Sequence, residues 1–425
     1  MWDLLAEYRD VRHPRNVGLI SLSHGVNEFY TIVLPPVLPL LVTDFGITYA
    51  QAGLLLTVFF LMYSVFQLPA GLVADRFGKK RVLVLGLAGM AASLVLAGAA
   101  GSYEALLVAQ ALAGISGSTY HPTGMSLVSD LESGETEGKA MGVFGFGGML
   151  GVATAPLAVG GVAALLGWRA ALVAAAVGGF GFVVVFYVLF REPGRTGREA
   201  PAPEPDGGAD EAPRTGGRLA RARGRLAGVL RFRITPPVAV LALLTLLISL
   251  QLRALHTFAT AFVVDGVGRS TALANGLFFT MLAASAVASI WVGGLADRFD
   301  RRLLGAAAAG VTTLILGGTF LLAAGDGLAG GLQTTALLVG AFALLGFAVY
   351  GCSPVKNALI SEYATESSSG GLFGVTQTTS AAGSAVGPAL FGAVATDAGV
   401  AVAFPLVATV SLLIAAGFLL LARVG

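Results

Sequence analysis

The chain has 425 residues, of which 56% are hydrophobic and only 12% are Asp, Glu, Lys or Arg, and its formal net charge is +2. Soluble domains are about half apolar and about a quarter charged, so this composition excludes an ordinary soluble protein. The mean hydropathy of +0.81 is typical of a chain that has lipid as its solvent. Cys352 is the single cysteine, which excludes an intrachain disulfide and a cysteine-built metal centre.

The first fifteen residues carry too many charges for the apolar core of a signal peptide. We expect them to form a short amphipathic helix on the membrane surface. Twelve apolar runs follow, and each is close to the roughly 20 helical residues that cross a bilayer. The predicted transmembrane helices lie at 17–42, 50–74, 82–100, 103–129, 139–166, 168–190, 236–264, 272–296, 303–324, 332–360, 370–396 and 398–422.

The placement of the cationic residues predicts the orientation of the chain. With the N-terminus in the cytoplasm, 22 of the 26 Lys and Arg residues fall in cytoplasmic segments, and only Arg169 and Arg269 fall outside. Cytoplasmic loops of membrane proteins carry such an excess of positive charge. We therefore expect a multi-pass protein of the plasma membrane with both termini in the cytoplasm.

Residues 191–235 differ in composition from the rest of the chain. The part that reads APAPEPDGGADEAPRTGG cannot bury a core, so we expect a disordered cytoplasmic linker. The basic run RLARARGRLAGVLRFR that follows is either an amphipathic helix on the inner leaflet or a set of arginines that only enforces the topology. Its membrane tether and its lack of stacking aromatics apart from Phe232 predict no nucleic-acid partner.

Internal repeats relate the two halves of the chain. ADRF occurs at 74–77 and at 296–299, an offset of 222 residues, and a second ungapped match with an offset of 232 aligns Pro122 with Pro354. Duplicated six-helix halves are a transporter architecture. We therefore predict an all-α integral membrane protein of twelve transmembrane helices in two pseudo-symmetric halves. Its parts are an N-terminal half at 1–190, the linker at 191–235 and a C-terminal half at 236–425.

The segment GLVADRFGKKR at 71–81 resembles the loop signature of the major facilitator superfamily, in which a Gly, an Asp-Arg pair, a Gly and a basic pair join the second and third helices. GGLADRFDRR at 293–302 is similar to a second copy of it. This resemblance implies a major facilitator fold and a transport function.

We expect the Asp of each signature segment, at 71–81 and at 293–302, to have an electrostatic partner. Asp75 at a helix end can meet the exposed N-terminus of the helix predicted at 370–396, across the interface between the halves. By pseudo-symmetry we expect Asp297 to face the helix that starts near Gly138. The alternative is a cluster that only anchors the topology. The predicted conformational latch comprises Gly71, Asp75, Arg76, Gly78, Lys79, Lys80, Asp297 and Arg298.

A narrower resemblance lies in the first, fourth and fifth predicted helices. HGVNEFY at 24–30, STYHPTG at 118–124 and GKAMGVFGFGGMLG at 138–151 are similar to the fosmidomycin-resistance-type branch of the superfamily. This resemblance implies export of an anionic drug in exchange for protons. Two positions depart from drug-exporting relatives: Gln110 stands where they carry an Arg, and Ala155 stands where a Gly is expected before the proline.

Six ionisable residues fall inside predicted spans, and each lies in the first helix of a three-helix unit. Ionisable groups are costly in lipid, so each is a functional candidate. His24, Asn27 and Glu28 share one helix face by their i, i+3, i+4 spacing. The alternative for a single residue is a stabilising pair, such as Glu28 with Arg253. The predicted substrate and proton pathway comprises His24, Asn27, Glu28, His121, Arg253, His256, Lys356 and Asn357.

These features predict a secondary transporter that exports a small organic anion or drug-like compound by alternating access, driven by protons. Arg253 and Lys356 would attract the anion, while Glu28 and the histidines would carry the coupling proton. Proton-coupled uptake with the same residues is the nearest alternative, because a sequence does not encode direction. A passive channel is a further alternative. Unlike a secondary transporter, it could not move its solute against a concentration gradient.

An enzyme embedded in the membrane is the alternative from a different class. It would need a nucleophile–base pair or a metal set, and three histidines on separate helices could in principle bind a metal. Duplicated halves give no reason for such a site, so we expect no enzymatic activity, no cofactor and no metal. GFGGMLG at 145–151 predicts close helix packing rather than a dinucleotide loop. The expected partners are a small solute, protons and the lipid bilayer, and the chain is expected to be a monomer.

Overall fold

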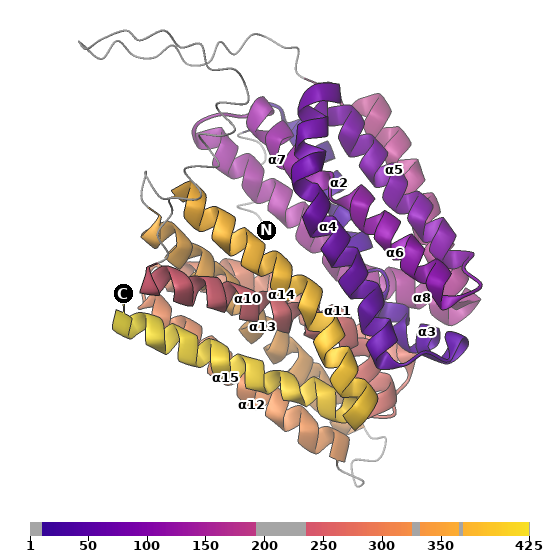
Figure 1. Ribbon diagram of the computed structural model, residues 1–425, viewed down its shortest axis with the longest axis vertical. Helices are drawn as coiled ribbons and strands as arrows, with labels where there is room; N and C mark the ends of the chain where they lie inside the picture. The colour runs from indigo at the N-terminus through magenta and orange to yellow at the C-terminus, as the bar shows by residue number, and fades with distance from the viewer. Residues whose placement is uncertain (1–10, 193–234, 325–331, 365–368, 425) are drawn as a thin grey trace.

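The computed structural model describes residues 11–192, 235–324, 332–364 and 369–424 (Figure 1). Every regular secondary-structure element assigned in these ranges is a helix. The first half contains α2 (Pro14–Thr31), η1 (Pro35–Val37), α3 (Leu38–Phe45), α4 (Tyr49–Phe77), α5 (Lys79–Gly98), α6 (Tyr103–Gly117), α7 (Tyr120–Leu131) and α8 (Glu135–Leu189). The second half contains α10 (Pro236–Ala261), η2 (Phe262–Gly266), α11 (Thr271–Ala296), α12 (Arg301–Ala324), α13 (Leu332–Tyr363), α14 (Ser369–Ala398) and α15 (Val400–Val424). The predicted linker at 191–235 is described only at 191–192 and 235, and the predicted surface helix at 1–15 only at 11–15, of which Pro14 and Arg15 already belong to α2.

The helices account for the twelve predicted crossings. In the described ranges, nine segments are long and apolar enough to cross a membrane. One of them, α8, has 55 residues and turns sharply at Gly167, whose φ of 82° suits glycine, so it supplies two crossings. The short helices α6 and α7 together form a further crossing, and α14 is the last. Every predicted span agrees with its helix to within four residues.

Prolines interrupt two of the transmembrane crossings, the first and the fourth. Pro35, Pro36 and Pro39 divide the first crossing into α2, η1 and α3. The fourth crossing breaks between α6 and α7, where Pro122 sits in the first turn of α7 and lacks the N–H of an uninterrupted helix. The break places His121, at the start of α7, in the middle of the bundle.

Glycines allow pairs of helices to touch along their backbones. A Cβ on Gly151 of α8 would lie 1.9 Å from the Gly25 carbonyl oxygen of α2, and one on Gly147 would lie 2.1 Å from the Ser21 carbonyl oxygen. In the second half, a Cβ on Gly383 of α14 would lie 2.2 Å from the Leu246 carbonyl oxygen of α10. The predicted close packing is therefore confirmed, and it recurs at pseudo-symmetric positions.

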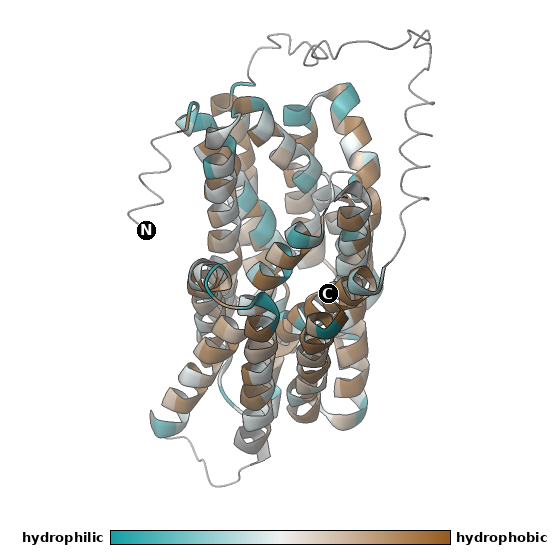
Figure 2. Cartoon of the chain, turned by 90° about the vertical axis from the view of Figure 1, so that its left-hand side faces the viewer, coloured by the Kyte–Doolittle hydropathy of each residue, from teal (hydrophilic) through white to brown (hydrophobic). Residues whose placement is uncertain are grey.

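The two halves are two helical groups that meet along α4 with α14 and α8 with α11 (Figure 1). Figure 2 shows apolar residues over much of the helical surface and hydrophilic residues concentrated at helix ends and between helices. Large apolar side chains such as Leu165, Leu314 and Leu68 are between 76% and 84% exposed, which suits a surface that faces lipid. The chain is thus an all-α integral membrane protein of two six-helix halves.

Charged residues gather at the two ends of the bundle. We call the end that carries Lys79, Lys80, Arg301 and Arg302 the basic end. There, Lys79 pairs with Asp130, and Arg301 pairs with Glu362 at 3.0 Å. We call the other end the distal end, where Asp44 pairs with Arg169 and Tyr49 donates to Asp265 across the two halves.

Candidate substrate and coupling site between the halves

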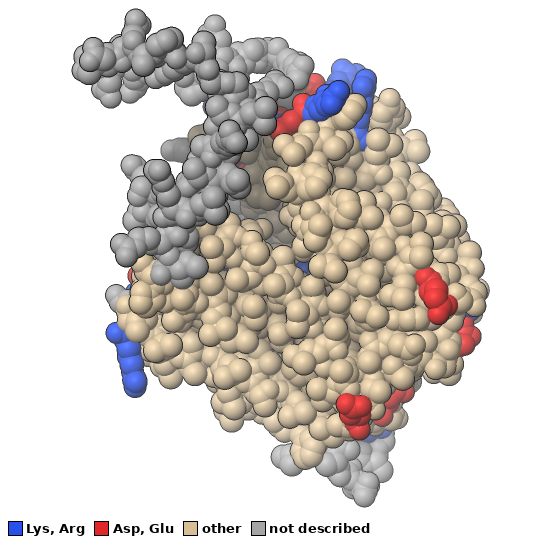
Figure 3. Space-filling model, viewed as in Figure 1, with Lys and Arg blue, Asp and Glu red and all other residues tan. Residues whose placement is uncertain are grey.

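A cavity of about 640 Å³ lies between the two halves and is lined by α2, α4, α7, α10 and α14 (Figure 3). Toward the distal end α4 touches α14: Thr57 Oγ1 donates to the Ala385 carbonyl at 2.7 Å, and a Cβ on Gly53 would lie 2.2 Å from the Pro388 carbonyl oxygen. Toward the basic end, residues within 60–67 of α4 and within 377–384 of α14 line the cavity. The halves are therefore in contact at the distal end and diverge toward the basic end.

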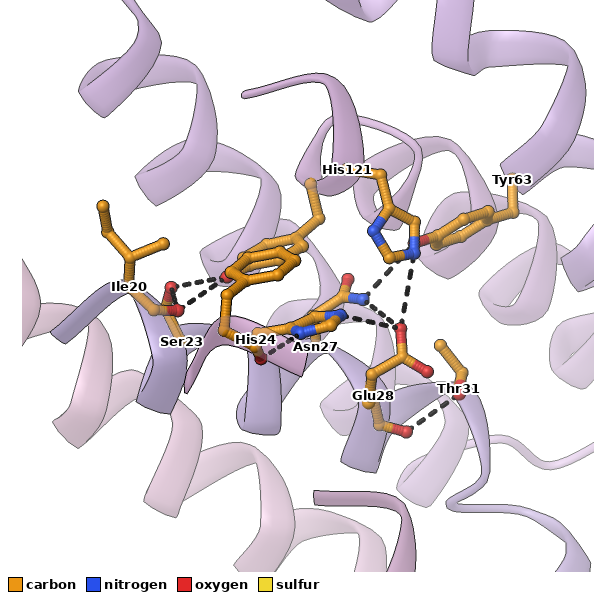
Figure 4. Close-up of polar contacts among 10 residues, drawn as sticks. Ile20, Ser23, His24, Asn27, Glu28, Thr31, Tyr63 and His121 are labelled. Carbon is orange, nitrogen blue, oxygen red and sulfur yellow. Dashed lines mark hydrogen bonds and ion pairs between the residues drawn. The ribbon is translucent and has the colours of Figure 1, made fainter. Parts of the chain in front are cut away.

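Four residues of the predicted pathway come together at one wall of this cavity (Figure 4). Glu28 Oε1 lies 3.7 Å from His24 Nε2 and 3.5 Å from His121 Nε2. Asn27 Nδ2 donates to the same oxygen at 3.0 Å. Glu28 and His121 line the cavity, whereas His24 is only 8% exposed and lies behind them. The i, i+4 spacing on α2 and the break before α7 together produce this cluster.

The position of His24 is set by its neighbours in α8. Its Nδ1 lies 2.8 Å from the Phe144 carbonyl oxygen, and its ring stacks on the Phe144 ring with centroids 4.0 Å apart and planes at 8°. A carbonyl oxygen can only accept, so Nδ1 carries a proton. In neutral His24 the lone pair is therefore on Nε2, the atom directed toward Glu28.

Tyr63 of α4 belongs to the same cluster, although the sequence analysis did not select it. Asn27 Nδ2 donates to Tyr63 Oη at 3.3 Å, and the Tyr63 ring meets His121 edge-on with centroids 6.0 Å apart. The analysis selected ionisable residues within spans and so overlooked a tyrosine in an apolar run. The hydroxyl at mid-span was the available signal.

Arg253 of α10 faces the cavity from the second half. Its guanidinium carbon lies 4.2 Å from the centroid of the Phe60 ring, and it forms no ion pair with any described residue. The alternative in which Glu28 pairs with Arg253 is thus not the observed arrangement. Polar residues of α14 complete this side of the cavity: Gln377, Thr378, Ser380 and Ser384. The polar run TQTTS within a predicted span was their signal in the sequence.

The structure places the other predicted pathway residues elsewhere. His256 is 4% exposed and its Nε2 lies 2.7 Å from Tyr350 Oη, within the second half. On α13, Lys356 is half-buried and Asn357 is exposed, and neither lines the cavity. The structure therefore brings together His24, Asn27, Glu28, His121 and Arg253, but not these three residues.

The residues of the predicted latch lie at the basic end. Gly78 has a φ of 97° and joins α4 to α5, so a glycine is required there. Asp75 and Arg76 are exposed, and Asp75 forms no hydrogen bond or ion pair with a described residue. Asp297 lies 3.9 Å from Arg301, the first residue of α12. The residues just before α14 are outside the described ranges, so the contact expected for Asp75 stays a prediction.

Similar curated proteins include transporters and resistance proteins. The chain is 35% identical to the fosmidomycin resistance protein of Escherichia coli (strain K12) over 141 residues, which are 33% of this chain and 34% of that protein. It is 34% identical to the puromycin resistance protein pur8 of Streptomyces alboniger over 134 residues, 31% of this chain and 26% of that protein. It is 27% identical to the probable L-galactonate transporter of Escherichia coli (strain K12) over 148 residues, 35% and 33% of the two chains. The chain therefore matches about a third or less of these relatives' length.

Solved structures match over nearly the whole length. A bacterial homologue of the human lysosomal transporter Spinster, in an inward-facing and unoccupied conformation, has a TM-score of 0.77 at 18% identity and covers 96% of this chain and 97% of that chain. The nucleoside transporter NupG has a TM-score of 0.75 at 14% identity, and the match covers 96% of this chain and 99% of that chain. The family model described as Major Facilitator Superfamily matches residues 20–332. That match spans more than half of the chain, and the chain belongs to the major facilitator superfamily of secondary transporters.

Proposed function

We propose that this transporter exports a small organic anion from the cytoplasm across the plasma membrane, in exchange for protons. The preference for an anionic solute rests on one observation, the guanidinium of Arg253 in the cavity. A guanidinium in a membrane cavity is costly, and no described carboxylate pairs with it. An anionic group of the solute would offset that cost through charge-assisted hydrogen bonds. The hydroxyl and amide side chains of α14 would contact the neutral polar part of the same solute.

Proton coupling is assigned to Glu28 with His24 and His121. The groups that face Glu28 are these two histidines, the amide of Asn27 and the hydroxyl of Tyr63 on α4, while Arg253 lines the same cavity from α10. Entry of an anion and loss of a proton change the charge of one small volume in the same direction. A proton on the cluster would therefore raise the affinity for the anion, and this mutual effect is the requirement for coupled transport. Its sign by itself favours movement of anion and proton together, so the assignment of exchange rests on the resistance proteins among the relatives.

The direction of transport rests on relatives and on charge. The fosmidomycin and puromycin resistance proteins are named for resistance, which favours export, whereas the probable L-galactonate transporter supports uptake as the second candidate. The excess of positive charge at the basic end supports a cytoplasmic position for that end. In that orientation the cavity faces the cytoplasm. We further propose that the transporter acts as a monomer.

The test is flux into proteoliposomes from panels of anionic, cationic and neutral solutes, with and without a pH gradient. We expect anions to be moved uphill only with the gradient, and a protonophore to abolish that movement. Arg253→Gln should weaken binding of the anion about 10- to 100-fold, since a hydrogen bond to a charged group contributes about 1.5–3 kcal/mol. Lys356→Gln is the matched control and should bind normally.

Two outcomes would contradict the proposal. Equal binding of the anion by wild type and Arg253→Gln would remove the assigned role of the guanidinium. Preference for a cationic or neutral solute, with flux unaffected by the protonophore, would overturn the substrate class and the coupling together.

A further inference from the structure

The geometry points to a binding site for a divalent transition-metal ion at His24, Glu28 and His121. Each side chain offers one ligand atom, and the three atoms all lie within 4.8 Å of one another. The two nitrogen–oxygen separations that involve Glu28 are 3.5 and 3.7 Å. Ligands about 2.0–2.2 Å from a tetrahedral zinc ion lie roughly 3.3–3.6 Å apart. The two separations that involve Glu28 are thus close to those between ligands of one metal ion, and they are long for direct hydrogen bonds.

The residues behind the cluster orient two of its ligands. Most histidines that bind a metal through one nitrogen donate the other N–H to a carbonyl or carboxylate. His24 does so, because its Nδ1 donates to the Phe144 carbonyl at 2.8 Å while Nε2 faces the centre. A Cβ on Gly148 would lie 2.5 Å from His24 Cε1, so the ring is held closely against α8. Asn27 donates to Glu28 at 3.0 Å and orients the carboxylate.

The donor set selects the class of ion. Two imidazole nitrogens and one carboxylate suit Zn²⁺, Co²⁺ or Ni²⁺, whereas Mg²⁺ and Ca²⁺ prefer oxygen ligands. Three protein ligands leave one position of a tetrahedron open. The side chains of Glu28 and His121 are 16% and 33% exposed to the cavity, so the open position would face the transported solute. The site is therefore suited to an anionic solute that also coordinates the ion.

The metal ion and the coupling proton would compete for the same ligand atoms, so the site binds one or the other. It goes beyond the proposed transport function, because it can be measured without any flux. Full-length protein, freed of any polyhistidine tag and purified in detergent, would be titrated with Zn²⁺ alone by calorimetry. We expect one ion per chain. Titration with Co²⁺ should give the intense visible absorption of a tetrahedral site, which a loosely bound surface ion lacks. His121→Ala should weaken the affinity for Zn²⁺ by 10- to 100-fold or more.

His256→Gln is the matched control, because this buried histidine lies in the other half and should leave Zn²⁺ binding unchanged. His121 is partly exposed, so His121→Ala should remain folded, and its thermal unfolding would verify this; His121→Asn serves as a second variant. The inference is overturned if folded wild type binds no Zn²⁺, or if both variants at position 121 bind it as tightly as wild type. A protein that binds Zn²⁺ but moves no solute would contradict the transport proposal alone.

Discussion

Glu28 illustrates how one residue acquires a role from its surroundings. Three nitrogens from two helices lie within 3.7 Å of a single carboxylate oxygen, on the wall of a cavity between the halves. A helix surface pattern alone predicts the His24–Glu28 pair, because residues four apart are neighbours on a helix. His121 reaches the pair only because the fourth crossing is broken next to it.

At the residue scale we expect Glu28→Gln to abolish uphill transport driven by a pH gradient. The amide imitates the neutral carboxyl and cannot release a proton, so the solute still binds while the coupling is lost. Exchange of labelled solute between equal pools should survive better than uphill flux. Both rates would be measured in the same proteoliposomes. Uphill flux in Glu28→Gln with the pH dependence of wild type would reduce Glu28 to a structural partner.

Glu132 follows the end of α7 and forms hydrogen bonds with the residues just before α2, outside the membrane spans. Its side chain is 1% exposed and accepts from the backbone N–H groups of Arg12 at 3.0 Å and His13 at 2.8 Å. Burial raises the pKa of Glu132. The backbone N–H groups of Arg12 and His13, the Thr136 hydroxyl and the charge of His13 lower it by more, so the pKa lies below its ordinary value. A group whose pKa falls on folding adds stability above its unfolded pKa and loses it as the pH falls through the folded pKa.

At the element scale we therefore expect Glu132→Gln to lower stability at neutral pH, because the bonds to a charged acceptor are lost. The loss should be about 2 kcal/mol. The difference from wild type should shrink under acid conditions, where wild type itself becomes protonated. Thermal unfolding of both proteins across the acid range measures this. A difference that stays constant down to acid pH would show that the charge of Glu132 does not contribute.

The packing of α2 against α8 depends on glycines at the contact. We expect Gly151→Val to destabilise the first half, because even a Cβ would lie 1.9 Å from the Gly25 carbonyl oxygen. Overpacking of this kind costs about 1–3 kcal/mol or more. Gly161→Val in the same helix is the control, since no atom lies within 4 Å of its Cβ position. Thermal unfolding of both variants would decide; equal melting temperatures would contradict the packing assignment.

At the scale of the whole molecule, the contact of α4 with α14 holds the distal end closed. We expect Gly53→Val to shift the population toward a conformation that is open at that end, because its side chain would clash with the Pro388 carbonyl. Distances between spin labels on loops of the two halves at the distal end should increase. Gly101→Val, in the loop between α5 and α6, is the control for general damage near helix ends, as its Cβ position has no neighbour within 4 Å and its φ is not positive. Unchanged distances in Gly53→Val would show that this contact does not set the conformation.

Much of the architecture was predictable because its causes are local in the sequence. Twelve apolar runs specify twelve crossings, since every backbone group in lipid must be bonded within its own helix. The Gly-Asp-Arg-Gly-basic segment at 71–81 and its copy predicted the family, which the family model confirms. α14 was predicted as one of these runs, although it is not among the nine segments of the described residues that are long and apolar enough to cross a membrane.

The composition of the site was decided by tertiary structure. Six ionisable residues were candidates from their position in the membrane alone, but that position does not reveal which helix face points into the cavity. His256 and Lys356 lie away from the cavity, whereas Tyr63 and the polar face of α14 belong to it. The sequence by itself determined the crossings, their duplication and the family, because hydropathy and glycine spacing act within one helix or one loop. The grouping of His24, Glu28 and His121 required the packing of α2, α7 and α8, which joins residues 120 positions apart in the chain.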